Sequence, residues 1–369
     1  MNRRLLFTGC IVLSICAFLL TACWDIKDIN NRYLPIVMAV DDREGGKYRV
    51  VLHYPLPGGQ GLASVEESAA TVSKAIDLMR TNVEKDISLL HIKLLIISKK
   101  LAEKGIGELL DVSLRSREIS PKALLAIASD DFDLMNEALD KSKGTETASF
   151  DFFNKQAGWT PNIPITPLWE AYGAWHSRTE DVAIPLISTG KEKGQFAFED
   201  SAVMREDRMV AAISRDDTML YNLFHGQYEG GTFEIDKQVT VRIIESSITH
   251  RTKWVQSFPT MTSRIKIVAL VLENKGGPVS NEELKAMMER SIRRRCEALI
   301  GKLNTSRADL LGTGKYFRGI MSDSEREHWK SDWYPKLKHE VEVNVTIGNA
   351  GYLKSKQKHI STYRDRNER

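Results

Sequence analysis

Cysteine is scarce in this sequence, and its few cysteines do not have the spacing of a metal site. Only four occur in 369 residues, at Cys10, Cys16, Cys23 and Cys296. None of them forms the C-x2-C pairs that structural zinc sites use. Cys296 falls within a helical pattern, where a small buried hydrophobe is a better interpretation than a reactive thiol. We therefore expect no metal site.

Recognisable catalytic motifs are also missing. The sequence holds neither a G-x-S-x-G nucleophile elbow nor H-E-x-x-H. Gly312-Thr-Gly314-Lys315 lacks the Walker spacing and the Ser or Thr after the lysine, so we reject it as a phosphate loop. We interpret His250, His328 and His339 as structural, and paired carboxylates such as Asp41-Asp42 as turn or cap residues. The sequence predicts no enzyme and no cofactor.

The chain has little net charge. It carries 52 basic and 49 acidic residues, and loss of Arg3 and Arg4 with an export signal would leave 50 against 49. This balance offers no argument for nucleic acid as a partner. It also offers none for a polybasic attraction to anionic lipid, so any membrane attachment must rest on another feature.

The N-terminus supplies such a feature. After Arg3 and Arg4, the apolar run Leu5 to Leu20 spans roughly 24 Å as a helix, which is short of a bilayer core and typical of a secretory signal. Leu20-Thr21-Ala22-Cys23 then resembles a lipobox. We expect cleavage between Ala22 and Cys23, and a diacylglyceryl group on the Cys23 thiol. An ordinary signal peptide with a chance cysteine is the alternative.

A diacylglyceryl group carries two acyl chains, the number that stable anchoring requires. The mature chain would therefore sit on a membrane surface without spanning it. The later apolar runs, Ala123 to Ala128 and Ile265 to Leu272, are too short to cross. With Cys10 and Cys16 removed and Cys23 blocked, Cys296 would have no partner for an intramolecular disulfide.

The first half of the mature chain alternates strand and helix patterns, which indicates a mixed α/β domain. Gly45-Gly46 predicts a turn between two of the strands. Residues 141–167 read as an irregular connection, and Ser188 to Gly194 as a linker. The expected strands are 36–40, 48–53, 94–98 and 122–129, and the expected helices are 72–83, 107–115, 131–139 and 168–176.

The second half is richer in strand patterns. Residues 196–204 and 209–214 predict a hairpin, 216–224 a short helix, and 239–248 with 265–272 two long strands. Ser280 and Glu283 form a capping box before a long amphipathic helix, to Leu303. Its arginines, from Arg290 to Arg295, are interpreted as a solvated face rather than an anion site. Val341 to Ile347 alternates apolar and polar residues as a half-buried strand does.

These patterns together predict an α+β fold with an α/β N-terminal domain and a β-richer C-terminal region that contains a long amphipathic helix. The expected division is a signal peptide over 1–22, an N-terminal domain over 23–190 and a C-terminal domain over 195–369. A further split near residue 260 is possible within the last of these.

The residues after the lipobox resemble a known family. Cys23-Trp24-Asp25-Ile26-Lys27-Asp28-Ile29 is similar to the Cys-Trp-Asp-x-x-Glu-Leu/Ile start of Ger(x)C spore germination lipoproteins, with Asp28 in place of the usual Glu. Asp309-Leu-Leu-Gly312-Thr-Gly314 looks like a degenerate form of the family's Asp-x-Phe-Gly-x-Gly motif, with Leu at the aromatic position. Trp329 and Trp333 then follow in family order.

The resemblance implies a function. Ger(x)C proteins are the C subunits of nutrient germinant receptors, on the outer face of the spore inner membrane, where they associate with an A subunit and a polytopic B subunit. The receptor responds to amino acids, sugars or nucleosides. Because the sequence lacks a catalytic constellation, we expect a structural or coupling role. The alternatives are an extracytoplasmic solute-binding lipoprotein and a lipid-anchored cell-wall hydrolase.

Overall fold

The computed structural model describes residues 31–129, 131–141, 160–190, 196–227, 231–235, 237–255, 258–276 and 279–348. The predicted signal peptide, the cleavage site after Ala22, the lipidation site Cys23 and the signature residues Trp24 and Asp25 lie outside these ranges. Most of the predicted irregular connection over 141–167 also lies outside them.

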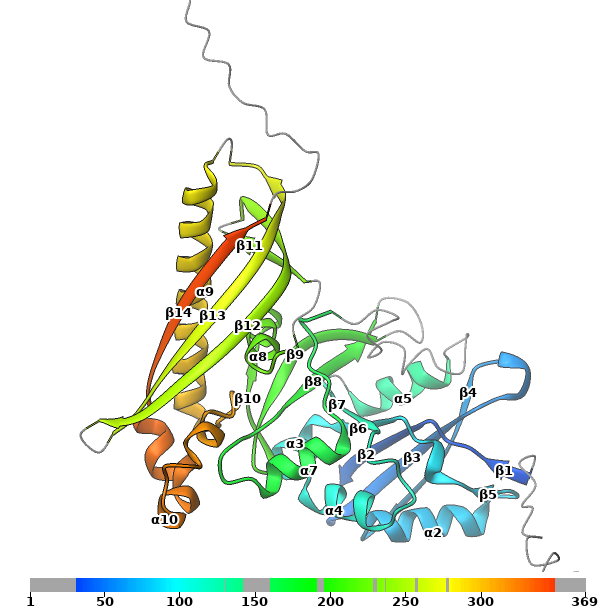
Figure 1. The fold of residues 1–369 in the computed structure, drawn as a ribbon. Coiled ribbons are helices and arrows are strands. Elements are labelled where there is room, and N and C mark those ends of the chain that lie inside the picture. Colours follow the sequence, from blue (N-terminus) through cyan, green and yellow to red (C-terminus); the bar gives the residue numbers. More distant parts are fainter. Residues whose placement is uncertain are drawn as a thin grey trace, which may run out of the picture.

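The first half of the chain builds a sheet of eight strands, in the order β10-β9-β8-β7-β6-β2-β3-β4 (Figure 1). Strands β2, β6, β7 and β8 are parallel at its centre, and the flanking strands pair antiparallel. A separate short parallel pair joins β1 to β5. The strands are β1 (Arg32–Tyr33), β2 (Val37–Arg43), β3 (Lys47–Pro55), β4 (Leu62–Ala69), β5 (Asp86–Ile87), β6 (Leu94–Ser98), β7 (Leu124–Ala128), β8 (Ala183–Thr189), β9 (Phe196–Arg205) and β10 (Arg208–Ile213).

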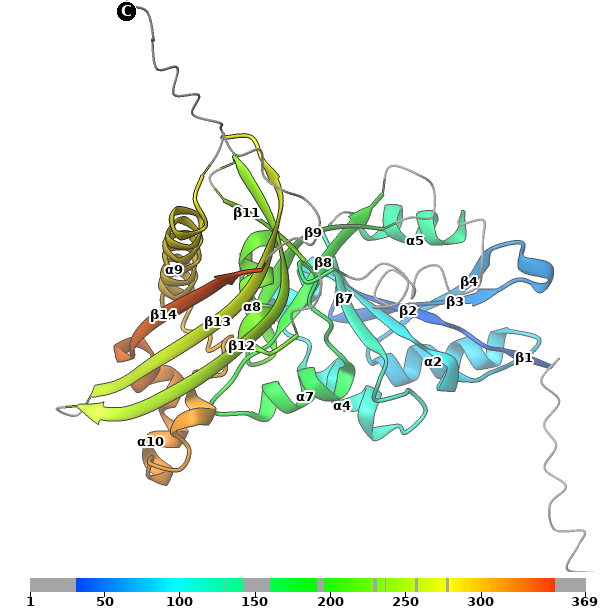
Figure 2. The ribbon, with the colours of Figure 1, turned by 45° about the horizontal axis from the view of Figure 1, so that its top comes forward.

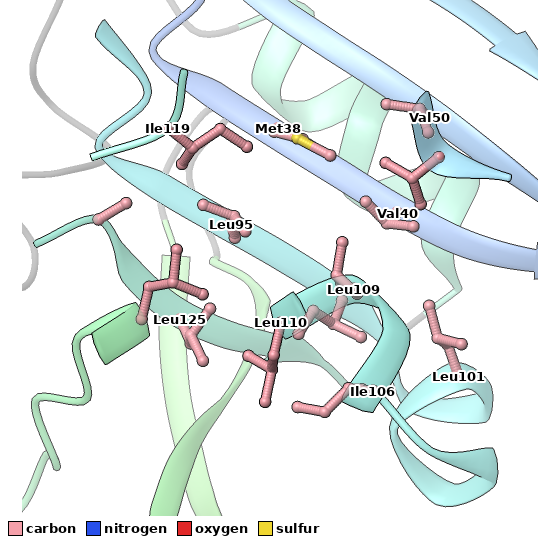
Figure 3. Packing of buried hydrophobic residues seen from close by; sticks show 14 of the residues in the cluster. Met38, Val40, Val50, Leu95, Leu101, Ile106, Leu109, Leu110, Ile119 and Leu125 are labelled. Atoms are coloured by element: carbon pink, nitrogen blue, oxygen red, sulfur yellow. The ribbon is translucent and has the colours of Figure 1, made fainter. Parts of the chain in front are cut away.

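Helices cover both faces of this sheet, which explains its continuous apolar strands. In β6, Leu95 and Ile97 join the core under one set of helices, while Leu94 and Ile96 join the core under α5 on the other face. Figure 3 shows Leu95 on its strand facing Leu109 and Leu110 of α4. The helices of the first face are α2 (Val72–Asn82), α3 (Lys99–Lys104), α4 (Gly107–Arg115) and α7 (Leu168–His176), and α5 is Phe132–Asp140.

The sheet continues past residue 190. Ser188 and Thr189, which we interpreted as the start of a linker, are the last residues of β8. The predicted hairpin of β9 and β10 is present, and β9 pairs antiparallel with β8. The apolar run from Ala183 to Ile187 forms a buried strand of the sheet. The strand continues through the polar residues Ser188 and Thr189 because they pair with Ala197 and Phe196 of β9. The expected domain division at 190–195 thus falls between two adjacent strands of one sheet.

The second sheet has four strands in the order β11-β12-β13-β14, and β13 pairs parallel with β14. Its two long strands form a hairpin that extends beyond the predicted ends (Figure 2). Over residues 249–255, exposed and half-buried side chains alternate along β12. This alternation, rather than a continuous apolar run, marks the second half of the strand. The strands are β11 (Thr232–Ile235), β12 (Val239–Val255), β13 (Phe258–Asn274) and β14 (Lys338–Ile347).

Helix α9 (Asn281–Ser306) packs against one face of this sheet and provides the crossover between β13 and β14. Its capping box is formed as predicted, with Ser280 and Glu283 bonded to each other's backbone. Cys296 is fully buried on its inner side. The shorter helix α8 (Arg215–Phe224) joins the same core. The α+β fold expected from the sequence is confirmed.

Four short helical segments follow α9 and support the end of the β12–β13 hairpin. They are η5 (Thr313–Phe317), α10 (Asp323–Glu327), η6 (Trp329–Trp333) and η7 (Tyr334–Lys336). Their apolar residues form a separate small core with Met261 of β13, which contains Phe317, Met321, Trp329, Tyr334 and Leu337. Among the helices that the structure describes, none is both long and apolar enough to cross a membrane.

Candidate functional site

The signature residue Asp309 lies fully buried in the loop that follows α9. Helix α9 ends at Ser306, and the C-cap residue Arg307 adopts the left-handed conformation (φ 53°) and turns the chain inward. The Asp309 carboxylate then accepts four hydrogen bonds. Thr313 donates two of them, from its backbone N–H (2.8 Å) and its hydroxyl (2.9 Å), and the others come from the Gly314 N–H (2.7 Å) and the Trp329 indole N–H (2.8 Å).

The glycines of this loop allow the indole of Trp329 to reach Asp309. A Cβ atom on Gly314 would lie 2.4 Å from Trp329 Nε1, which is closer than real contacts allow. Gly312 has a φ of +60°, in the region that glycine adopts without a steric penalty. Trp329 itself is fully buried. In the motif that we identified through a family resemblance, Gly314 therefore leaves space for the indole of Trp329, and Gly312 allows the left-handed turn of the loop.

Two further residues, Asp181 and Lys330, complete the network. The Asp181 carboxylate accepts from the Asp309 N–H (2.8 Å) and from the Lys330 ammonium (2.6 Å), and the Asp181 N–H donates to the Asp309 carbonyl (3.0 Å). Asp181 lies just before β8, so these bonds fasten the eight-stranded sheet to the loop of the C-terminal region. We call Asp181, Asp309, Gly314, Trp329 and Lys330 the buried joint.

Burial dominates the electrostatics of the buried joint. Desolvation raises the pKa of Asp309 to about 6, although its hydrogen bonds favour the charged form. Desolvation also raises the pKa of Asp181, and Lys330 opposes that shift. Both side chains of the Asp181–Lys330 ion pair are largely withdrawn from water. Removal of one partner from such a network leaves an uncompensated buried polar group. We therefore expect substitution of a single member of the joint to lower the stability of the fold.

Contacts beside the buried joint also connect the segment before β8 to the loop that follows α9. The Arg318 guanidinium donates to the Thr179 hydroxyl at 2.9 Å through Nε and at 2.7 Å through Nη2. Arg318 also lies 3.5 Å from the Glu180 carboxylate. Residues 179–181 are thus held along the side of the loop over residues 309–318. Trp333, the last signature residue, packs edge-to-face on Trp254 of β12 at 5.0 Å.

A second polar cluster connects β12, β13 and β14. Ser263 lies between two histidines, with its hydroxyl 2.9 Å from His250 Nδ1 and 2.7 Å from His339 Nε2. Phe224 and Tyr316 pack against the imidazoles. Burial lowers the pKa of both histidines to about 4, so both are neutral at pH 7. Ser263 is itself fully buried, which agrees with a structural rather than a nucleophilic interpretation of these residues.

We expect His339→Gln to make stability less sensitive to acid. A histidine whose pKa is depressed from 6.5 to about 4 stabilises the fold fully above pH 6.5, and this contribution is lost as the pH falls toward 4. The loss corresponds to about 3 kcal/mol for His339. Chemical denaturation at pH 7 and pH 4 should show that the stability advantage of the wild type over His339→Gln shrinks by this amount. An unchanged difference would refute the assignment, and the exposed His328→Gln is the control.

The structure brings together most signature residues that lie within its described ranges. Asp309, Gly314 and Trp329 bond or pack with one another, Gly312 shapes the same loop, and Trp333 lies in the adjacent aromatic core. Sequence reasoning missed Asp181, for which the sequence offers no local pattern. It placed Lys330 beside Trp329 in the family order but gave it no partner. Over the described residues, no group of three or more metal-ligating side chains gathers. The buried side-chain donors and acceptors of Asp181, Asp309, Trp329 and Lys330 all have partners within the described residues.

The fold and the joint define a class of protein: an α+β chain whose two sheets are fastened by a buried polar network. Two models of known protein families match this chain. "Spore germination protein N-terminal domain" matches residues 25–189, and "Spore germination B3/ GerAC like, C-terminal" matches residues 199–351. Together they span most of the sequence. The chain therefore belongs to the Ger(x)C family of spore germination proteins.

Individual relatives agree with this assignment. "Putative spore germination protein YfkR" of Bacillus subtilis (strain 168) is 21% identical over 93% of this chain and 97% of its own length. "Spore germination protein GerQC" of Bacillus cereus is 21% identical over 95% of this chain and 99% of its own length. The solved structure titled "Crystal Structure of the GerBC protein" superposes with a TM-score of 0.58 at 15% identity, covering 85% of this chain and 97% of that one. The last comparison shows that the fold is shared.

Proposed function

We propose that this chain is the lipid-anchored C subunit of a spore nutrient germinant receptor, and that it acts as a structural or coupling subunit. The observation that carries this proposal is the match to both family models, which together extend from residue 25 to residue 351. The buried joint adds a physical reason for a coupling role. A fastened connection between two sheets lets a force or displacement at one sheet reach the other without loss in a flexible linker.

The lipid anchor is the first part of the proposal that can be tested. Cys23→Ala removes the only thiol of the lipobox-like sequence, so the chain should remain unlipidated and uncleaved. Metabolic labelling with a radioactive fatty acid should give no labelled band, while the unprocessed precursor accumulates. Thr21→Ala leaves the thiol in place and should be labelled normally. Label on the Cys23→Ala chain would contradict the anchor.

The partners are the second part. We propose that the chain lies on the outer face of the spore inner membrane, together with the receptor's A subunit and its polytopic B subunit. Affinity purification of a tagged chain from detergent-solubilised spore membranes, followed by mass spectrometry, should recover both. Recovery of the chain without a polytopic protein would contradict a receptor subunit, and the same purification with an unrelated tagged spore lipoprotein is the control.

Solute binding is the second candidate. A hollow of about 150 Å³ between α2 and α4 favours it, with apolar residues such as Val72, Ile76 and Ile119 on its wall. The charged groups there are Asp77, Arg80 and Glu118, and Arg80 is already paired with both carboxylates. Isothermal titration of the purified chain with amino acids, sugars and nucleosides distinguishes the two functions. Saturable heat that Ile76→Trp abolishes would favour a binder, and its absence would favour a coupling subunit.

A further inference from the structure

The free end of the β12–β13 hairpin combines exposed apolar side chains with lysines. We define the hairpin tip as Lys253, Val255, Phe258 and Thr260 of the hairpin, together with Lys336 and Lys338 beside it. Val255 and Phe258 face each other across the two strands, and they keep 42% and 46% of their surface exposed. Most exposed apolar residues are scattered singly, so a pair at the end of a projecting hairpin needs an explanation.

Two of the lysines, Lys253 and Lys338, lie on the same face as the apolar pair. Lys253, Thr260 and Lys338 form one row across β12, β13 and β14, next to the Val255–Phe258 row. Lys336 lies beside them with its ammonium 5.1 Å from the centre of the Trp333 ring. Among the described residues, no acidic side chain lines the hollow that these residues form.

The positive charge is local to the tip. In the next row along the sheet, Arg251 and Glu340 lie on either side of Thr262, and in the row after that Arg264 forms an ion pair with Glu342 at 2.7 Å. The charges balance within these two rows, whereas the row at the tip carries lysines without an acidic residue. The balance of basic and acidic residues over the whole chain conceals this cluster, because a net charge averages over all surfaces.

The opposite face of the tip is packed, so the tip is held in place. Trp254 lies 5.0 Å from Trp333 and 6.1 Å from Phe317, ring centre to ring centre, and Met261 is fully buried in the same aromatic core. Phe317 in turn contacts Trp329 of the buried joint at 5.1 Å. The signature residues Trp329 and Trp333 thus belong to the aromatic core that packs beneath the strand ends carrying Val255 and Phe258.

We propose that the hairpin tip is a second membrane contact, which inserts Val255 and Phe258 into the interface of an anionic bilayer while the three lysines face the lipid phosphates. Exposed apolar side chains beside lysines are the composition that binds such interfaces. Attraction of about fivefold in affinity per lysine gives roughly 100-fold for three. This proposal rests on the proposed function, because a lipid anchor on the same chain brings the membrane within reach.

The two proposed attachments belong to different ends of the molecule. In Figures 1 and 2 the hairpin tip and β1, near the start of the described chain, lie at opposite ends of the molecule. The stretch between Cys23 and β1 can span at most about 30 Å. Two attachments at opposite ends would fix the orientation of the protein on the membrane, and the anchor would make even a weak contact at the tip effective through local concentration.

The test places an environment-sensitive dye at the tip of the full mature chain. Val255→Cys provides the site of attachment, since the buried Cys296 thiol has a pKa raised to about 12 and does not compete. In vesicles that contain phosphatidylglycerol, the emission should shift to the blue and bromine-labelled lipid should quench it. In phosphatidylcholine vesicles both effects should be absent. The dye at Thr346→Cys, at the far end of β14, is the matched control and should remain in water in both.

Charge reversal tests the role of the lysines. Lys253→Glu/Lys338→Glu should abolish the shift at position 255 in anionic vesicles. Arg242→Glu/Lys266→Glu makes the same change of net charge far from the tip and should leave the shift intact. Equal shifts in neutral and anionic vesicles, or no shift in either, would overturn the proposal. A shift that requires a co-reconstituted receptor subunit would also overturn it, because the tip would then bind protein.

Failure of this proposal can be told apart from failure of the proposed anchor. A chain that floats with vesicles in a density gradient but keeps its tip dye in water has its anchor and lacks the second contact. A chain that does not float at all has lost the anchor on which the proposed function depends, and Cys23→Ala provides that reference.

Discussion

Asp309→Ala is expected to lower the free energy of unfolding of the C-terminal region by about 4 kcal/mol. The substitution leaves four buried donors without an acceptor, from Thr313, Gly314 and Trp329. Each unsatisfied donor costs about 1–3 kcal/mol. Relief of charge burial opposes this loss, and the rise of the Asp309 pKa to about 6 corresponds to about 3 kcal/mol. The cost of leaving four donors unsatisfied exceeds the gain from no longer burying the charge.

Chemical denaturation followed by tryptophan fluorescence measures this effect, because Trp329 of the joint and Trp254 and Trp333 beside it contribute to the emission of the seven tryptophans. The pH dependence gives a second check. A carboxylate with a raised pKa adds stability below its unfolded pKa and loses it as the pH rises through about 6. The deficit of the variant should therefore grow from pH 7 to pH 4.

Asp309→Asn separates charge from hydrogen bonding. It removes the charge, keeps one acceptor oxygen, and turns an N–H toward at least one former donor, so it should also be destabilising. Asp323→Ala, at an almost fully exposed side chain in the first turn of α10, should change the free energy of unfolding by less than about 0.5 kcal/mol. If Asp309→Asn were more stable than the wild type, charge burial would dominate and our count of donors would be the wrong argument.

Gly314→Ala is expected to cost about 3 kcal/mol of unfolding free energy. Its new methyl group would lie 2.4 Å from Trp329 Nε1 and 2.7 Å from two further indole atoms. The indole is fully buried and packs on Phe317, so it cannot move without displacing the aromatic core. The displacement should also weaken the bond from Trp329 to Asp309.

Gly319→Ala is the matched control for this substitution. Gly319 lies five residues further on, its added methyl group would have nothing within 4 Å, and it is exposed. Its unfolding free energy should stay within about 0.5 kcal/mol of the wild type. Equal effects of the two substitutions in chemical denaturation would show that backbone freedom, rather than contact with Trp329, decides the cost.

Elements with local start and stop signals could be predicted from the sequence. The helices over 107–115 and 168–176 and the strand over 94–98 have the predicted bounds, because prolines, glycines and a short apolar run mark their ends. Strand β4 was missed, since its half-exposed residues, from Ala63 to Ser68, carry no clear apolar pattern. It exists through its pairing with β3, which no local pattern encodes.

The residues of the buried joint could likewise be predicted from the sequence only in part. Asp309, Gly314 and Trp329 could be named from the family resemblance, and the structure explains them by hydrogen bonds and close packing. The pairing of Asp181 with Lys330 could not be predicted, because these residues are 149 positions apart and only folding brings them together. Asp181 stands 128 residues before Asp309, its other partner.

By itself, the sequence determined the family, the expected anchor at Cys23 and the α+β class, since these depend on short motifs and on periodic patterns of apolar residues. Only the tertiary structure decided that β9 and β10 extend the first sheet, that Asp181 meets Asp309, and that lysines from β12 and β14 gather beside Val255 and Phe258. The physical reason is that strand pairing and side-chain contacts join residues far apart in the chain, whereas a motif or a helical period is complete within a few turns.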